Sequence, residues 1–565
     1  KSPIATAVRQ KPVDIASKGF LAHRLILHED YQRAASVIED QLRPHEPEQY
    51  HLCAVEYALD EGYHDRPDEP VRVADLGDRL ESVRAWALAS NPLNAARWWV
   101  ASARCILIDG GSDDKRRALM HFKNAIETAA ELPDFYPWVC IYFGRALLRF
   151  GLYEAAKLIF NRAVETAMNL NSAVCAGIAA QELALLHSRT GNNQSALEYA
   201  EASAHLMKER GHFRGLARAY TARAMDKRGR VSYRHLLGSQ TSDADLYDAA
   251  LEDLQSAAVV AGSANYEGWI GEINREYAVT RSVAARDIVD FKPDVARALF
   301  DQAWTDLERA SEQVKQIPIA TERISARARV QQASMMLHKT AQAFEEEEIG
   351  DSAAISIALL NESHAILRQQ EWMLFMTLAT DWLELSYIYD LFRFEFTEDI
   401  IAPSETRYGR FQQEDPLYEM VLEVDKRLTE LGQNLPAILP SFGVTGFSDS
   451  VTISALAEHH KGRLELIAGT LAQVEGGNQA ALEHYVRGIR LIAHGAYATN
   501  YVKRVIDMLD VRFGQLHNPD LRMWWASMMK DNWGKSEIIR SNFPELLTFC
   551  DFQKLIGTHE SGEGL

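Results

Sequence analysis

FGRALLRFGLYEAAKLIFNRA, residues 143–163, carries the clearest structural signal of the chain. Apolar residues recur at steps of three and four on both sides of Gly151, which is the spacing of amphipathic helices. Gly151 lies where a first helix must end and the chain must turn. Gly144 lets two helices approach closely, and Phe160 fills the gap between them. These residues therefore predict a pair of packed helices joined by a short turn.

The same arrangement of small and large residues returns elsewhere. Gly151, Gly191 and Gly229 follow one another at a period of about 38–40 residues, as expected for a repeat array. Alternating strand-like segments are nearly absent, so the sequence predicts an all-α protein. The recurring positions are Ala184, Ala196 and Ala200; Tyr247, Ala250, Leu254 and Ala257; Gly469, Gly476, Asn478, Ala481, Tyr485 and Gly488; and, more loosely, Ala22, Leu25, Tyr31, Ala34 and Ile38.

Composition excludes several classes of protein. The 565 residues are 47% hydrophobic and 25% charged, which is typical of a folded chain. The net charge of −19 disfavours bulk binding of nucleic acid. No apolar run is long enough to span a membrane. The five cysteines form no CxxC pair, so we expect no disulfide framework or zinc site, and a reducing cytoplasm fits best.

The repeated pattern resembles the tetratricopeptide-repeat family over about two thirds of the chain, although the period exceeds the standard 34 residues. The resemblance implies a right-handed superhelical solenoid of roughly ten helix pairs, each packed on its neighbours. We expect the array to occupy residues 1–431, with insertions near 230–246 and 398–416. Residues 432–450 suggest a linker or insertion, 451–497 a final repeat, and 498–565 a C-terminal helical cap.

The candidate catalytic and metal-binding motifs lack the residue spacing that such sites require. Gly534-Lys535-Ser536 resembles the end of a phosphate-binding loop, but Met529 stands where that motif needs a glycine. His459 and His460 lack the spacing of a zinc-binding helix. Three cysteines are spaced 35 residues apart: Cys105, Cys140 and Cys175. They are best explained as buried small side chains. We therefore expect no catalytic residue, no metal ligand and no cofactor.

The resemblance also suggests where a ligand would bind, because the first helix of each pair lines the concave surface of such solenoids. Six polar or basic residues then face inward as a basic stripe in an acidic protein: Arg145, Arg149, Gln181, Arg189, Arg223 and Lys227. Such a stripe suits a carboxylate-rich protein or peptide. The alternative is that these side chains pair with acidic neighbours or remain solvated.

The end of the chain gives a second resemblance. LELIAG (464–469), QAALEHY (479–485) and NYVKRVIDML (500–509) are similar to the closing repeats of bacterial STAND NTPases. That class places an NTPase before a ligand-sensing repeat array, and several members act in antiphage defence. The resemblance implies the cytoplasmic sensor part of a longer protein, an expectation that the lack of an initiator Met fits. Its ligand would be a protein or peptide, with oligomers formed through upstream domains and no binding to nucleic acid or membrane.

Two alternatives remain open at this point. The same groove would serve a free-standing adaptor or scaffold protein without any NTPase. An enzyme with its catalytic residues on the 398–416 and 432–450 segments is the third hypothesis. It would need a polar cluster with shifted pKa values in a closed pocket.

Overall fold

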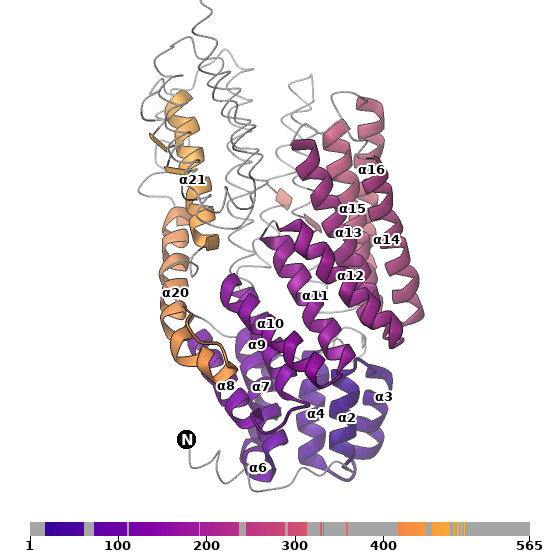
Figure 1. Cartoon of the computed structure of the whole chain (residues 1–565), viewed down its shortest axis with the longest axis vertical. Coiled ribbons are helices and arrows are strands. Elements are labelled where there is room, and N and C mark those ends of the chain that lie inside the picture. Colours follow the sequence, from indigo (N-terminus) through magenta and orange to yellow (C-terminus); the bar gives the residue numbers. More distant parts are fainter. Residues whose placement is uncertain are drawn as a thin grey trace, which may run out of the picture.

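The computed structural model describes residues 17–60, 73–109, 112–190, 192–236, 244–288, 292–313, 416–447 and 455–474, together with a few isolated positions beyond 327. Every regular element in these ranges is a helix (Figure 1), which confirms the all-α prediction. No helix in this part of the chain is long and apolar enough to cross a membrane.

The elements follow one another with short connections. The first group comprises α2 (Lys18–Leu27), α3 (Tyr31–Ser36), the π-helix η1 (Val37–Leu42), α4 (Pro47–Leu59), α5 (Val73–Ser82) and α6 (Arg84–Ser90). The array continues with α7 (Pro92–Asp109), α8 (Ser112–Ala129), α9 (Tyr136–Arg149), α10 (Tyr153–Asn169), α11 (Ala173–Arg189), α12 (Asn193–Glu209), α13 (Phe213–Leu236), α14 (Ala244–Ser263), α15 (Glu267–Ile288) and α16 (Pro293–Gln313). Later come α20 (Pro416–Ile438), the 3-10 helix η4 (Leu439–Phe442) and α21 (Ala455–Val474).

Helices α7 to α16 form a repeat solenoid. Each helix packs on the next along the chain, and α9 also contacts α11, α11 contacts α13, and α13 contacts α15. Among the even-numbered helices from α8 to α16, no pair makes comparable contacts. The odd-numbered helices α7, α9, α11, α13 and α15 therefore make a continuous layer, called the inner layer below, and the even-numbered helices flank it (Figure 1). This is the arrangement that the repeat pattern predicts.

Close approach within a pair depends on small residues. A Cβ atom placed on Gly144 of α9 would lie only 2.5 Å from the ring of Phe160 in α10. Met207 of α12 meets Gly177 of α11 and Gly215 of α13 in the same way. Gly144 and Phe160 thus play the roles that the sequence assigned to them. Most other described repeat positions are likewise core residues, including Ala184, Ala196, Ala200, Ala250, Leu254 and Ala257, all with no exposed surface.

The turns between helices require a residue whose backbone adopts the left-handed conformation. Gly151, Asn171, Gly211 and Asn265 have φ between 49° and 76°, a region that glycine and asparagine occupy at low cost. Gly151 therefore ends α9 as the sequence predicts. The turn after α2 differs, because Glu29 occupies the left-handed position there with φ 57°.

Residues 416–447 return to the middle of the array. Leu428, Leu431 and Leu435 of α20 are buried in the same core as α9 and α10. The ring of Phe442 stacks on Phe143 of α9 with centroids 4.2 Å apart. Figure 1 shows the lower end of α20 meeting α8. Residues 432–447, which suggest a linker or insertion in the sequence, therefore fill the core beside α8 and α9.

The domain boundaries themselves stay a prediction. Helix α13 ends at Leu236 and α14 begins at Ala244, so part of the expected 230–246 insertion is helical. Helix α21 covers the first half of the expected final repeat. The expected insertion at 398–416, apart from Pro416, and the expected cap at 498–565 lie outside the described residues. The hand of the superhelix also remains an expectation.

We expect Gly144→Ala to destabilise the α9–α10 pair by about 1–3 kcal/mol, because its methyl group overpacks against Phe160, which has no exposed surface. Gly77→Ala in α5 is the matched control, because no atom lies within 4 Å of a Cβ there. Amide hydrogen exchange of α9 and α10 measures the effect. Unchanged exchange in Gly144→Ala would contradict the close contact.

The return of α20 gives a second test. Phe442→Ala removes a ring that is fully buried against Phe143, so we expect it to lower stability by about 3–5 kcal/mol. Leu422→Ala in α20 is the control, because Leu422 is 44% exposed. Thermal unfolding of both variants, followed by circular dichroism, compares the losses. Equal melting temperatures would argue against the packing of η4 on α9.

Candidate binding site on the inner layer

The predicted binding residues share one structural layer. Arg145 and Arg149 lie in α9, and Gln181 and Arg189 lie in α11. Arg223 and Lys227 lie in α13. Helix α9 contacts α11, and α11 contacts α13, so the inner layer brings the six positions onto adjoining helices.

Three of the predicted cations bind carboxylates of a following helix. Arg145 Nη2 lies 2.8 Å from Glu182 Oε1 in α11. In α13, Arg223 Nη2 and Lys227 Nζ lie 2.5 and 2.7 Å from the two carboxylate oxygens of Asp253 in α14. The alternative explanation, pairing with acidic neighbours, therefore describes these three side chains. Their charge is already balanced within the protein, so an external carboxylate would have to compete for it.

The other predicted residues differ in their surroundings. Arg149 is exposed at the last position of α9. The side chain of Arg189, at the end of α11, is outside the described structure. Gln181 is buried, and its side-chain oxygen accepts a hydrogen bond from Arg218 Nε at 3.2 Å. Gln181 thus positions an arginine of the next inner-layer helix.

Arg218 is the functional candidate that the sequence did not reveal. It lies in the second turn of α13 and is 4% exposed. Besides Gln181, it donates to the hydroxyl of Tyr266 at 3.1 Å. Its Nη2 forms an ion pair with Glu29 in the turn between α2 and α3. The two partners are 189 residues apart, so no local spacing could have indicated this pair.

The turn that carries Glu29, residues 28–31, is called the α2–α3 corner below, and it has several contacts with the array. The carbonyl oxygen of His28 accepts a hydrogen bond from His212 Nε2 at 2.8 Å. His212 Nδ1 in turn accepts from the backbone N–H of Gly215 at 3.1 Å, which caps the start of α13. The Arg214 guanidinium lies over the ring of Tyr31 at 4.8 Å. The corner is therefore seated on the beginning of α13.

Electrostatics favour an ionised Glu29. Burial is the largest single influence and would raise the pKa of this carboxyl group. The charge and hydrogen bond of Arg218, with smaller effects of His212 and Arg145, together outweigh it, so the pKa of Glu29 lies below its usual value. The carboxylate is therefore charged and anchored at neutral pH. Arg145, predicted as a ligand-binding residue, contributes to the field that holds it.

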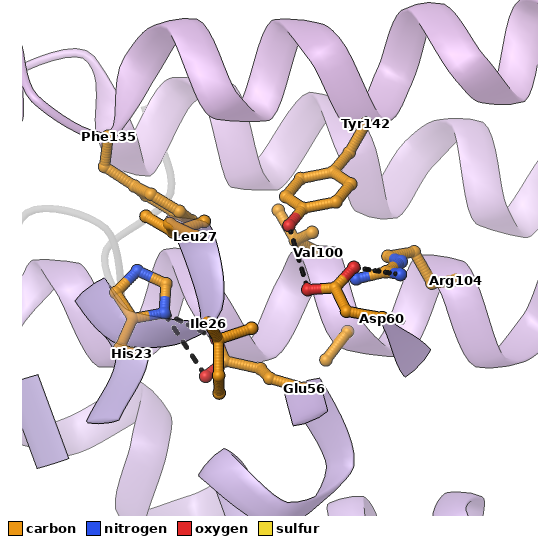
Figure 2. A pocket seen from close by; sticks show the side chains of 10 residues that line it. His23, Ile26, Leu27, Glu56, Asp60, Val100, Arg104, Phe135 and Tyr142 are labelled. Atoms are coloured by element: carbon orange, nitrogen blue, oxygen red, sulfur yellow. Dashed lines mark hydrogen bonds and ion pairs between the residues drawn. The ribbon is translucent and has the colours of Figure 1, made fainter. Parts of the chain in front are cut away.

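A second polar cluster lies between α2 and α4 on one side and α7 and α9 on the other (Figure 2). His23 Nδ1 is 3.3 Å from Glu56 Oε2, on one side of a small cavity. On the other side, Asp60 accepts hydrogen bonds from Arg104 at 2.7 Å and from the Tyr142 hydroxyl at 3.2 Å. The cavity volume is about 10 Å³, which is room for about one water molecule.

The cavity borders a buried ion pair. Arg97 has no exposed side-chain surface, and its Nη2 lies 2.5 Å from Glu56 Oε2. The positive charge of Arg97, with hydrogen bonds from Arg97 and His23, holds the pKa of Glu56 far below its usual range, although burial opposes them. Among the described residues, His23 Nε2 has no hydrogen-bond partner. A site of this size suits the joining of two groups of helices better than the binding of a substrate.

The buried cysteines offer no nucleophile at neutral pH. Burial raises the pKa of Cys53 to about 11 despite the nearby Arg97. Burial also raises the pKa of Cys140 and Cys175 far above the usual value. Thiolates are the reactive form of cysteine, so these side chains act as small core residues. Cys105, Cys140 and Cys175 are all buried, as the sequence analysis expects. No group of His, Cys, Asp or Glu suited to a metal ion occurs among the residues that the structure describes.

Comparisons with known proteins add little to this geometry. No model of a protein family matches the chain, and no curated protein matches it. Among solved structures, it is similar to a protein described as a circular tandem repeat protein with novel repeat topology and enhanced subunit contact surfaces. That match covers 97% of each chain at 11% identity with a TM-score of 0.22. A score this low supports no argument, so the description as a helical repeat solenoid depends on the chain's own contacts.

Buried histidines predict a loss of stability in acid. Burial lowers the pKa of His187 and of His121 to about 4, from 6.5 for the free side chain. Between pH 7 and 4 the unfolded chain binds protons that the folded chain does not, so stability falls with falling pH. We expect the melting temperature to be lower at pH 5 than at pH 7.5. His187→Phe, which can keep the ring stacked on Tyr199, should reduce that difference by roughly 1 °C.

The control for this experiment is His205→Phe, because the His205 side chain is 72% exposed. We expect this variant to keep the full difference between the two pH values. The same melting temperature for the parent protein at pH 5 and 7.5 would show that the buried histidines do not control its acid stability.

Proposed function

We propose that the chain is a non-catalytic module that binds a protein or peptide on its inner layer. The observation that carries this proposal is the seating of the α2–α3 corner. A helical turn with a carboxylate lies on α13, and its Glu29 pairs with the buried Arg218. A surface that accepts such a turn from its own chain has the shape and charge to accept one from a partner.

The chemistry favours an acidic partner. Arg218 is held by Gln181 and Tyr266, so its guanidinium does not need to be ordered when a carboxylate arrives. Charge-assisted hydrogen bonds of this kind are stronger than neutral ones. Arg149, which is exposed at the end of α9, offers a further charge on the same layer. Acidic side chains on a helix or turn therefore suit this surface best.

The resemblances in the sequence support a finer proposal. We propose that the module is a tetratricopeptide-like array acting in the cytoplasm as the ligand sensor of a STAND-type NTPase, with a role in antiphage defence. Binding would then relieve inhibition of an upstream NTPase. A free-standing adaptor with the same inner layer is the alternative. The full open reading frame separates the two, because a phosphate-binding loop upstream supports the sensor and a start codon directly before Lys1 supports the adaptor.

A capture experiment tests the proposed function. The parent protein and an Arg149→Glu/Arg189→Glu variant are used as baits in lysates of the source organism, prepared with and without phage infection. We expect at least one protein to be captured by the parent and lost at least tenfold by the variant, because reversed charges repel an acidic partner. Quantitative mass spectrometry measures the capture.

Arg210→Glu is the matched control, because Arg210 is exposed at the end of α12, outside the inner layer. It makes the same type of charge change and should leave capture unaltered. Equal capture by all three baits would contradict binding at the inner layer.

A further inference from the structure

The α2–α3 unit, residues 18–42, is only lightly joined to the main core of the array. Its buried side chains, among them Ile26, Tyr31 and Leu42, pack mainly on one another and on side chains of α4. Among the described apolar side chains of this unit, Leu27 is the buried one that enters the main core, with Phe20 packed at the edge. The buried ring of His23 also lies edge to face on Phe135 of that core, with centroids 5.1 Å apart. The cavity of Figure 2 lies along the same boundary, between α2 and the pair α7 and α9. The boundary is therefore incompletely filled.

Polar and ring contacts hold the corner of this unit on the array. Glu29 pairs with Arg218, and the His28 carbonyl accepts a hydrogen bond from His212. The rings of His28 and Trp138 lie edge to face with centroids 6.3 Å apart. Contacts of this kind can be exchanged for equivalent contacts with another chain, because they require a carboxylate and a turn but no long apolar face.

Glu29 is an imperfect ligand for Arg218. Its backbone has φ 57°, a left-handed conformation that is unfavourable for a glutamate. Among the described residues, its Oε2 has no hydrogen-bond partner, and His212 Nε2 lies 3.8 Å away. The other left-handed turns of the described array use glycine or asparagine. The turn alone therefore does not account for a glutamate at this position, whereas the carboxylate does.

The receiving side is ordered without help from Glu29. Gln181 and Tyr266, which lie outside α13, both accept hydrogen bonds from Arg218. The ring of Tyr266 has no exposed surface and stacks on Trp269 with centroids 5.8 Å apart. Removing the corner would leave Arg218 positioned and exposed, which is the condition of a preformed anion site.

We propose that Arg218, Gln181 and His212 form a carboxylate-binding site, and that Glu29 is its resident ligand from the same chain. An acidic residue on a helical turn of a partner protein takes this site when the α2–α3 unit moves away. The proposal rests on the function proposed above and names the place where the partner's carboxylate binds. The resident corner then sets the threshold for binding, because a partner must displace it.

Two variants of the full chain separate the parts of this proposal. Glu29→Gln weakens the binding of the corner and leaves the carboxylate-binding site intact. Arg218→Gln also weakens the binding of the corner, but it removes the site itself. Both should increase amide exchange in residues 19–36 at least tenfold, with α11 and α12 unchanged. Glu198→Gln, an exposed carboxylate in α12, is the control and should exchange like the parent.

The probe is a labelled synthetic peptide with the sequence of residues 24–36, RLILHEDYQRAAS. We expect it to bind the Glu29→Gln chain at least ten times more tightly than the parent, measured by fluorescence anisotropy. The Arg218→Gln chain should bind it no better than the parent. A second peptide with Glu29→Gln should lose the gain.

Three results would overturn the proposal. One is unchanged exchange in both variants, because the ion pair would then not hold the corner. Another is equal binding of the two peptides to the Glu29→Gln chain, because the site would then not select a carboxylate. A third is tight peptide binding to Arg218→Gln, because Arg218 would then not be the receptor.

These measurements fail independently of the capture experiment. If the peptide results are as expected but lysate capture does not depend on Arg149 and Arg189, the displaceable corner stands and the capture of a partner through Arg149 and Arg189 is wrong. If capture depends on those residues but the peptide results fail, the proposed function stands and the site at Arg218 is wrong.

Discussion

The structure depends on buried and half-buried arginines that pair with a carboxylate on another element. A charge withdrawn from water is costly without a partner, so each such arginine fixes how its helix sits against the element that supplies the carboxylate. In α7, Arg97 and Arg104 pair with acidic residues at or beside α4. Farther along, the same arrangement joins α9 to α11, α13 to α14 and α15, and α15 to α16. The latter pairs are Arg145–Glu182, Arg223–Asp253, Arg228–Glu276 and Arg281–Asp306.

This constraint changes how the basic stripe should be understood. Most of its charge is used inside the protein, so the inner layer is not a strip of unpaired cations awaiting a ligand. Arg218 differs from the others in one respect that matters for function. Its carboxylate comes from the distant α2–α3 corner, whereas Arg145 and Arg223 are paired with the adjoining repeat. A pair that closes over a long separation can open without disturbing the repeat itself, since the neighbours of Arg218 remain in place.

Local patterns in the sequence were sufficient for the helices and for the pairing of α9 with α10. Gly144, Gly151 and Phe160 lie within 17 residues, and contacts at that range leave a clear spacing. The partners of the arginines could not be predicted in this way, because a register of side chains on separate helices depends on the superhelical geometry. Prolines in the 432–450 segment gave no indication of its packing for another reason. Pro436 and Pro440 suggest a break in the helix, yet Pro436 lies inside α20, whose leucines at 428, 431 and 435 keep helical spacing.

The stacking of Phe442 on Phe143 has a consequence for the synthesis of the chain. In a simple solenoid each repeat can complete its core as soon as its neighbour has emerged. Here the core around α8 and α9 includes side chains that follow almost 300 residues later. At typical translation rates the ribosome needs about 15–60 s to make that length. For that period the apolar surface around Phe122 and Phe143 stays open on the nascent chain, where it is a natural binding site for chaperones and a source of misassembly with other chains.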